Sequence, residues 1–296
     1  TIYSKQAVFE YGNTKFTLID TPGHVDFAAE TERTLSVLDY AVLLISGADG
    51  VQGHTKTLWK LLKAYEIPTI VFVNKMDQEK ANKEKLLTEI KSKLSDSCAE
   101  FCDFEGLAMG SEEAMEEFLE TGTLSRERIA GLVKERAVFP VLFGSALKLE
   151  GVKELLETLD DYCQEEDFSK ELGVCVFKIE SLGMDLRLTD VKVTGGCLKV
   201  KDTLPNGEKI NQIRIYSGAK FKQVDELCAG QVGSLVGPVK TDACQCVGTE
   251  DCLKGSLLNP VLKYAIRFND DTDPAKAYLK LMALSEEDPT IDVSFN

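Results

Sequence analysis

The sequence has 296 residues, 44% of them hydrophobic and 28% charged, which leaves room for two globular domains and part of a third. Its formal net charge of −15 argues against nonspecific nucleic-acid binding through a general basic surface. No apolar run approaches the ~20 residues of a membrane span, and no signal-peptide pattern is present. We therefore expect a cytoplasmic monomer that binds neither membranes nor specific DNA sequences.

The nine cysteines of a chain without a secretory pattern favour free thiols in a reducing compartment. Cys244 and Cys246, with Cys252 nearby, could bind a metal, but the region lacks a second Cys-x-x-Cys or a histidine partner. Cys98 and Cys102 lie four positions apart, a spacing that favours a packed helix face. The cysteine pattern therefore favours packed thiols over a metal site.

The chain opens with two predicted strands, residues 6–11 and 15–19, joined by a turn at residues 12–13. The second strand runs into the loop DTPGHVDF, residues 20–27. A carboxylate at the end of a strand, followed by a tight Pro-Gly turn, is how an α/β protein presents an acid to a phosphate-bound metal. We expect this loop to be functional, although an ordinary turn is the alternative when it is taken alone.

Three residues of this loop carry the expected chemistry. Asp20 would face Mg²⁺, through a water, because this ion prefers hard oxygen ligands. Gly23 has no Cβ, so its backbone N–H can approach a terminal phosphate closely. His24 can reach a water in line with that phosphate, although a lone histidine is more often a surface residue.

A helix–strand alternation follows, which predicts a parallel sheet with covering helices. The expected elements are a helix at 25–38, a strand at 41–45, a helix at 55–65 and a buried strand at 69–73. That last strand, TIVFV, ends in NKMD. The carboxylate of Asp77 can accept two hydrogen bonds from guanine, whereas adenine presents an acceptor there. The stem of Lys75 can lie over the base, and Asn74 can tie neighbouring loops together.

The next stretch, residues 78–139, is charged and mostly helical, with amphipathic segments at 82–94, 112–120 and 125–136. It leads into a third apolar strand, residues 139–143, which is followed by Ser145, Ala146 and Leu147. A backbone amide of this tripeptide can meet the carbonyl of the base. Ligands of open α/β sheets bind at the carboxyl ends of strands, so the three loops together predict a site for GTP or GDP with Mg²⁺.

A closing helix at 151–163 and an acidic linker at 164–172 end this part of the chain. Beyond it, strand-like runs recur between turn residues and predict an antiparallel barrel. The runs are residues 174–179, 188–193, 197–200, 209–216 and 233–236. From residue 258 a strand to 268 and a helix at 273–284 indicate a new domain. The predicted domains are therefore a GTP-binding domain at 1–165, a β-barrel at 172–257 and the start of an α+β domain at 258–296.

The motif order DTPGH, NKMD and SAL resembles the GTP-binding domain of translational GTPases. The segments RTLSVLD at 33–39, GVQ at 50–52 and IPTI at 67–70 are similar to the elongation factor G group, and within it most of all to the tetracycline-resistance ribosomal protection proteins. The interval between Asp77 and Ser145 also lacks the larger extra subdomain of bacterial elongation factor G. The resemblance covers nearly the whole chain and implies an α/β nucleotide-binding domain of the P-loop GTPase type.

The resemblance implies a role for each matched residue. His24 matches the catalytic histidine that positions the attacking water once a ribosome orders the site. Thr1 matches the switch threonine that ligates Mg²⁺ in the GTP state. The nucleotide-binding residues it implies are Asp20, Gly23, Asn74, Lys75, Asp77, Ser145, Ala146 and Leu147.

A phosphate-cradling Gly-x-x-x-x-Gly-Lys-Ser/Thr loop occurs nowhere in the sequence. In relatives that loop precedes the first switch, whose last residues are similar to Thr1 and Ile2. We therefore expect a fragment whose parent carries the loop upstream. Without those N–H groups and the lysine, we expect this chain alone to bind GTP weakly and to hydrolyse it negligibly.

The function that the resemblance implies is a ribosome-dependent GTPase that dislodges tetracycline from stalled ribosomes. A translocation factor of the elongation factor G type, or a relative of peptide chain release factor three, is the near alternative. An alternative of another class is a ribosome-docking module that no longer hydrolyses nucleotide. Retention of Asp20, His24, Asn74, Lys75 and Asp77 argues against that last alternative, because a degenerate site has no chemical need for all five.

Overall fold

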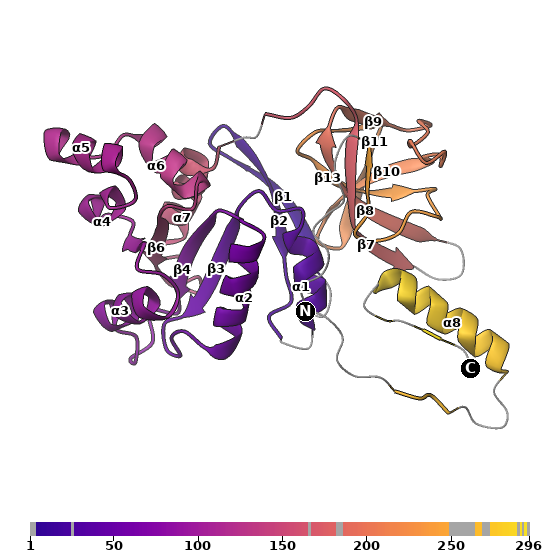
Figure 1. The fold of residues 1–296 in the computed structure, drawn as a ribbon, viewed down its shortest axis with the longest axis horizontal. Helices are drawn as coiled ribbons and strands as arrows, with labels where there is room; N and C mark the ends of the chain where they lie inside the picture. Colours follow the sequence, from indigo (N-terminus) through magenta and orange to yellow (C-terminus); the bar gives the residue numbers. More distant parts are fainter. Residues whose placement is uncertain are drawn as a thin grey trace. The chain divides into compact units, whose positions relative to one another are not determined.

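Figure 1 shows the computed structural model of the chain. It describes residues 4–24, 27–164, 167–181, 186–248, 264–267, 273–288, 291 and 293–294. The chain forms two compact units, which are described separately: the α/β unit holds residues 10–15 and 38–165, and the β unit holds residues 1–9, 16–37 and 166–296. In the described ranges, no helix is long and apolar enough to cross a membrane.

A four-stranded parallel sheet forms the centre of the α/β unit, in the order β3-β4-β6-β5. The strands are β3 (Ala41–Ser46), β4 (Thr69–Asn74), β5 (Cys98–Glu100) and β6 (Phe139–Phe143). All residues of β4 except its last are buried, as expected for a strand covered on both faces. The pairing sets Ser46 beside Asn74 and Val73 beside Phe143, so the predicted base-binding segments begin at one edge of this sheet.

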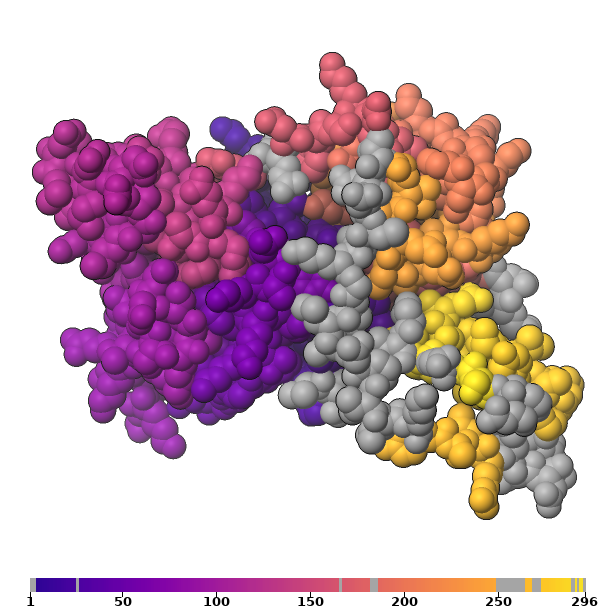
Figure 2. Space-filling model, in the orientation of Figure 1, coloured from indigo at the N-terminus to yellow at the C-terminus, as the bar shows by residue number. Residues whose placement is uncertain are grey.

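Six helices complete the α/β unit. They are α2 (Gly53–Ala64), α3 (Lys83–Lys93), α4 (Phe104–Ala108), α5 (Glu112–Thr121), α6 (Arg126–Lys134) and α7 (Val152–Tyr162). Polar residues cap the N-termini of α3, α4 and α5. The side chains of Asn82, Asp103 and Ser111 accept hydrogen bonds from backbone N–H groups of the first turn. Figure 1 shows α2 beside β3, and Trp59 of α2 meets Phe139 of β6 edge-on, with ring centroids 4.7 Å apart. Figure 2 shows the side chains of this unit, purple to magenta, closely packed.

Antiparallel strands dominate the β unit and form a six-stranded sheet, β11-β10-β13-β8-β7-β14, and a two-stranded sheet, β12-β9. Their bounds are β7 (Gly173–Ser181), β8 (Arg187–Gly195), β9 (Cys197–Lys199), β10 (Gln212–Ser217), β11 (Lys220–Val224), β12 (Glu226–Cys228), β13 (Val232–Val236) and β14 (Cys246–Gly248). Both sheets contribute to one core, in which Val191, Leu198, Ile213, Leu227 and Leu235 are fully buried. This arrangement confirms the predicted change from a parallel α/β sheet to an antiparallel domain.

The N-terminal hairpin of β1 (Lys5–Tyr11) and β2 (Thr14–Asp20) is a separate two-stranded sheet. Helix α1 (Ala28–Leu35) follows it and is shorter than the predicted 25–38, because the backbone turns at residues 36–37. Helix α8 (Pro274–Glu287) confirms the predicted C-terminal helix. The predicted strand that ends at residue 268 is wrong for residues 264–267, which are irregular, and its other residues lie outside the described part of the chain.

The expectation that the cysteines are all free thiols is wrong for four of them. Disulfides join Cys175 to Cys246 and Cys197 to Cys228. Each pair occupies directly opposite positions on neighbouring antiparallel strands, β7 with β14 and β9 with β12. Register, which local sequence does not reveal, therefore brings them together, with Cα atoms 4.1 and 4.0 Å apart.

Two other cysteine expectations also change. Cys98 begins strand β5 and pairs with Phe139, so Cys98 and Cys102 do not share a helix face. A strand of three residues carries too little periodicity to compete with an i, i+4 spacing. The metal alternative for Cys244 and Cys246 loses one thiol to the disulfide, and Cys252 lies outside the described residues.

Candidate functional site

Two loops at the carboxyl edge of the parallel sheet are joined by the side chain of Asn74, the last residue of β4. Its Oδ1 accepts hydrogen bonds from the backbone N–H of Lys75 (2.7 Å) and of Ala146 (2.8 Å). Backbone bonds reinforce the link, because Met76 N donates to Gly144 O at 3.0 Å and Gly144 N donates to Val73 O at 2.9 Å. The NKMD loop and the SAL loop therefore form one connected structure, as the sequence predicted for Asn74.

Lys75 adopts a left-handed backbone conformation with φ of 64°. A non-glycine residue in this region costs free energy and persists when its surroundings over-determine it. The hydrogen bond from its own N–H to Asn74 Oδ1 supplies part of that constraint. The side chain of Lys75 is exposed, so its stem is available to cover a planar ligand.

Ser145 of the SAL loop is hydrogen-bonded to Asp77 of the NKMD loop, the acid that is predicted to bind the base. Its side chain is fully buried, and its hydrogen bond to Asp77 lowers the pKa of that carboxyl below its usual value, with a smaller contribution from Lys148. Asp77 is exposed and stays ionised near neutral pH. The result is an oriented carboxylate that can accept hydrogen bonds from a ligand.

Two glycines close the loop that holds Ser145. A Cβ on Gly144 would lie 2.3 Å from Glu150 O, and one on Gly151 would lie 2.5 Å from Phe143 O. Gly151 also has a φ of 73°, a conformation that glycine adopts at little cost. This close approach, with reciprocal hydrogen bonds between Ser145 and Glu150, leaves Ala146 and Leu147 exposed at the loop tip.

The loop that follows β2 belongs to the β unit. Asp20, Gly23 and His24 are all exposed, and a Cβ added to Gly23 would meet no described atom within 4 Å. Packing among the described residues therefore does not demand a glycine at this position. The ring of His24 lies 6.1 Å from that of Phe27, centroid to centroid. Thr1, the other predicted Mg²⁺ ligand, lies outside the described residues.

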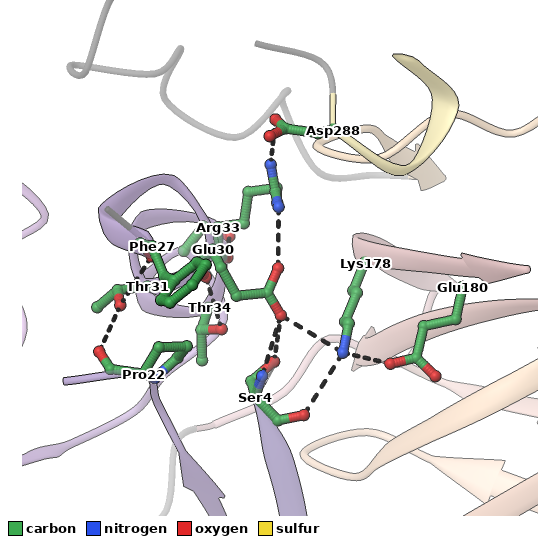
Figure 3. Close-up of polar contacts among 11 residues, drawn as sticks. Ser4, Pro22, Phe27, Glu30, Thr31, Arg33, Thr34, Lys178, Glu180 and Asp288 are labelled. Carbon is green, nitrogen blue, oxygen red and sulfur yellow. Dashed lines mark hydrogen bonds and ion pairs between the residues drawn. The ribbon is translucent and has the colours of Figure 1, made fainter. Parts of the chain in front are cut away.

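Behind this loop, a network of buried charges surrounds helix α1 (Figure 3). Glu30 Oε1 accepts hydrogen bonds from Ser4 N at 3.1 Å and Ser4 Oγ at 2.7 Å, and lies 3.4 Å from Lys178 Nζ. Its Oε2 lies 2.9 Å from Arg33, whose other nitrogen contacts Asp288 at 2.7 Å. Lys178 also pairs with Glu180. Side-chain exposure is only 8% for Glu30 and 5% for Lys178.

The charges of this network stabilise one another against burial. Burial opposes ionisation of Glu30, but Lys178 and the hydrogen bonds from Ser4 and Arg33 outweigh it and lower its pKa. Burial likewise opposes the charge of Lys178, and its carboxylate partners raise its pKa above the usual value. Both groups remain charged at neutral pH. Removing one takes away part of the charge compensation of the other, while Glu30 keeps Arg33 and Lys178 keeps Glu180.

Comparison with protein-family profiles matches residues 1–165 to the elongation factor Tu GTP binding domain. The match covers more than half of the chain. The chain belongs to this GTP-binding family. The loops at Asp20, Asn74 and Ser145 therefore lie in a domain whose family binds guanine nucleotide.

Curated relatives extend the likeness beyond the GTP-binding domain. The tetracycline resistance protein TetP of Clostridium perfringens is 31% identical over an alignment that covers all of this chain and 51% of that protein. TetO of Streptococcus pneumoniae is 30% identical over 78% of this chain and 40% of that protein. The chain thus spans about half the length of these relatives, or less, and is related to these tetracycline resistance proteins.

A solved crystal structure, that of ttk003000868 from Thermus thermophilus, matches with a TM-score of 0.85 and 20% identity. The match covers 99% of this chain and 54% of that one. At this identity the likeness concerns the fold. The shared fold is an α/β domain followed by an antiparallel β domain.

The sequence reading did not identify the network around Glu30. Lys178 interrupts the apolar run of β7, and a lysine inside a buried strand is a signal that a partner charge lies nearby. This signal does not reveal the pairing, since Lys178 and Glu30 are far apart in the sequence.

Asp190 of β8 adds a titrating group beside this network, and we expect Asp190→Asn to stabilise the chain above neutral pH. The pKa of Asp190 is raised from 3.8 to about 7, mainly by burial and also by the negative charges of Glu180 and Glu30. A hydrogen bond from Ser234 and the positive charge of Lys178 act in the opposite direction. The raised pKa contributes stability that is complete below pH 3.8 and is lost as pH rises through about 7. The stability advantage of the variant should therefore grow by about 2 kcal/mol between pH 5.5 and 7.5 and then level off.

Urea unfolding of wild type and variant across pH 5.5–8.5 measures this difference. Asparagine keeps the size of the side chain and can still bond Ser234, so the comparison isolates the charge. A difference that stays constant across this pH range would show that Asp190 does not titrate there in the folded chain.

Proposed function

We propose that the protein carrying this chain is a ribosome-dependent GTPase of translation that protects ribosomes by releasing tetracycline. The proposed binding of guanine nucleotide rests on the hydrogen bond that the Ala146 N–H donates to the Asn74 side chain. This bond joins the two loops that are expected to hold one guanine base. Similarity to TetP along the whole chain supports the ribosomal part. A cytoplasmic location and a ribosome as partner follow from this function.

In the proposed complex, the α/β unit recognises the base. Asp77 accepts hydrogen bonds from the ring N–H and the exocyclic amine of guanine, and the stem of Lys75 covers one face of the ring. An exposed N–H in the segment of Ser145, Ala146 and Leu147 donates to the base carbonyl. The ionised, Ser145-bonded state of Asp77 supports this role, because a carboxylate acceptor strengthens both bonds.

In the β unit, the Asp20 loop serves the phosphate end of the nucleotide. Asp20 offers an exposed carboxylate at the end of β2, a hard oxygen ligand that suits Mg²⁺ held through water; Thr1 would add a hydroxyl. The ion would neutralise phosphate charge. Gly23 approaches the terminal phosphate with its N–H. His24 holds the attacking water in line, so its imidazole does not have to be a strong base.

The test is GTP hydrolysis by the full-length protein with ribosomes that carry labelled tetracycline. We expect ribosomes to stimulate hydrolysis and the drug to dissociate only when GTP is supplied. Stimulated hydrolysis with retained drug and accelerated movement of peptidyl-tRNA would support a translocation factor instead. Ribosome binding without hydrolysis would support a docking module and would overturn the proposed activity.

A further inference from the structure

Helix α1 is tied to the loop that carries His24 by two hydrogen bonds. Phe27 N donates to His24 O at 3.0 Å, and Thr31 Oγ1 donates to Pro22 O at 3.2 Å. Thr31 is buried, so its bond is shielded from competing water. A shift of α1 would therefore move the backbone of the loop.

The residue before Thr31 in the same helix turn ties α1 to strand β7 of the β unit. Glu30 is the neighbour of Thr31, and its carboxylate reaches Lys178 on β7 and Ser4 just before β1 (Figure 3). Lys178 Nζ also lies 3.4 Å from Ser4 O. One buried carboxylate thus connects the helix after the His24 loop to a strand of the large antiparallel sheet and to the N-terminal hairpin.

Apolar packing alone would not define the position of α1 so narrowly. Val37 packs with Phe177 and Val232 in a small core cluster nearby, and such contacts tolerate sliding because they have no direction. An ion pair with hydrogen bonds has fixed partners, and a shift that separates Glu30 from Lys178 takes an opposite charge away from each of two buried groups. The pair therefore penalises displacement of α1.

A second tie runs from α1 to the C-terminal helix. Arg33 contacts Asp288 at the end of α8, and Glu287 accepts a hydrogen bond from Ser181 N of β7 at 3.0 Å. The exposed fraction of Asp288 is 31%, which makes this tie the weaker of the two. It can be broken separately from the contact between Glu30 and Lys178.

We propose that Glu30 and Lys178 are a positioning pair that holds α1, and through it the His24 loop, in the placement needed for GTP hydrolysis. Neither residue touches the nucleotide in this proposal. The catalytic consequence rests on the proposed GTPase function, whereas the mechanical claim, that the pair holds the loop, does not. Two measurements separate these claims.

The first measurement is amide hydrogen exchange of this chain, followed by mass spectrometry. Glu30→Gln and Lys178→Met should each speed exchange in residues 20–35 by about tenfold or more. Exchange in the double variant should be no faster than in the more affected single variant, because each single variant already breaks the same pair. Lys178→Arg keeps the charge and should stay within about threefold of wild type. If Lys178→Met unfolds the chain, Glu30→Gln, which has the same shape as glutamate, decides alone.

The matched control is Glu208→Gln. Glu208 is also a carboxylate of the β unit, and it accepts hydrogen bonds from Val239 N at 2.6 Å and Lys240 N at 2.7 Å. Its loss should loosen residues 239–241 and leave residues 20–35 unchanged. Unchanged exchange of residues 20–35 in Glu30→Gln, or equal loosening by Glu208→Gln, would overturn the mechanical claim.

The second measurement is ribosome-stimulated GTP hydrolysis by the full-length protein. Glu30→Gln should lower kcat by about tenfold or more while GTP affinity stays near wild type. Lys178→Met should lower kcat in the same way, whereas Lys178→Arg should retain most of the wild-type rate. A normal kcat in Glu30→Gln, with faster loop exchange, would overturn the catalytic consequence. Absence of stimulated hydrolysis in wild type would instead overturn the proposed function, and the exchange result would still decide the mechanical claim.

Discussion

Replacing His24 by alanine is expected to abolish ribosome-stimulated GTP hydrolysis while leaving GTP binding near normal. His24 is exposed at the end of the DTPGH loop, and its backbone carbonyl accepts the Phe27 N–H, so the loop keeps its course when the imidazole is removed. Loss of a side chain that orients the attacking water should cost at least about a hundredfold in kcat. Single-turnover hydrolysis with saturating ribosomes measures this.

The chain supplies a matched control for that variant, because it has only one other histidine. His54 lies in the first turn of α2, in the α/β unit, and no catalytic role is assigned to it. His54→Ala should keep stimulated hydrolysis near the wild-type rate. Hydrolysis by His24→Ala within about tenfold of wild type would remove His24 from the mechanism.

Replacing Asp77 by asparagine is expected to change which base the site selects. The carboxylate can accept from both the ring N–H and the amine of guanine, whereas an amide presents one acceptor and one donor. Xanthine has a carbonyl in place of that amine, so the variant should bind xanthosine triphosphate better than GTP. Loss of a charge-assisted bond should weaken GTP by about ten- to a hundredfold.

Competition binding with GTP, ITP and XTP on the full-length protein measures this change of preference. Asp49→Asn is the matched control, since Asp49 is also in a loop after a strand of the same parallel sheet and its carboxylate accepts a hydrogen bond from Ser46 Oγ at 2.7 Å. That variant should retain guanine preference. If Asp77→Asn retains it as well, Asp77 does not read the base.

The elements that the sequence predicted well are those with strong local signals. Residues 69–73 and 139–143 are continuous apolar runs, and both became strands buried in a parallel sheet. Because parallel strands carry loops at a shared edge, Asn74 could be predicted to link the two loops before its bond to Ala146 was known. Ser145 was expected at the base, but its burial and its bond to Asp77 depend on the closed loop at Gly144 and Gly151.

Features that depend on distant pairing were missed. Strand β11 is mostly exposed, so it lacks the apolar alternation that marks a half-buried strand, and it is defined by its pairing with β10. Strands β12 and β14 have three residues each, and their cysteines meet partners set by register. The contact between Glu30 and Lys178 likewise joins a helix and a strand from different parts of the chain.

A crystal structure of the full-length protein with GDP and Mg²⁺ tests the central claim most directly, because that claim places three loops around one nucleotide. We expect the guanine base between Asp77 and the Ser145 loop, with the phosphate end and its ion at Asp20 and Gly23. A nucleotide bound without contact to Asp77, or with its phosphates away from Asp20, would contradict the account.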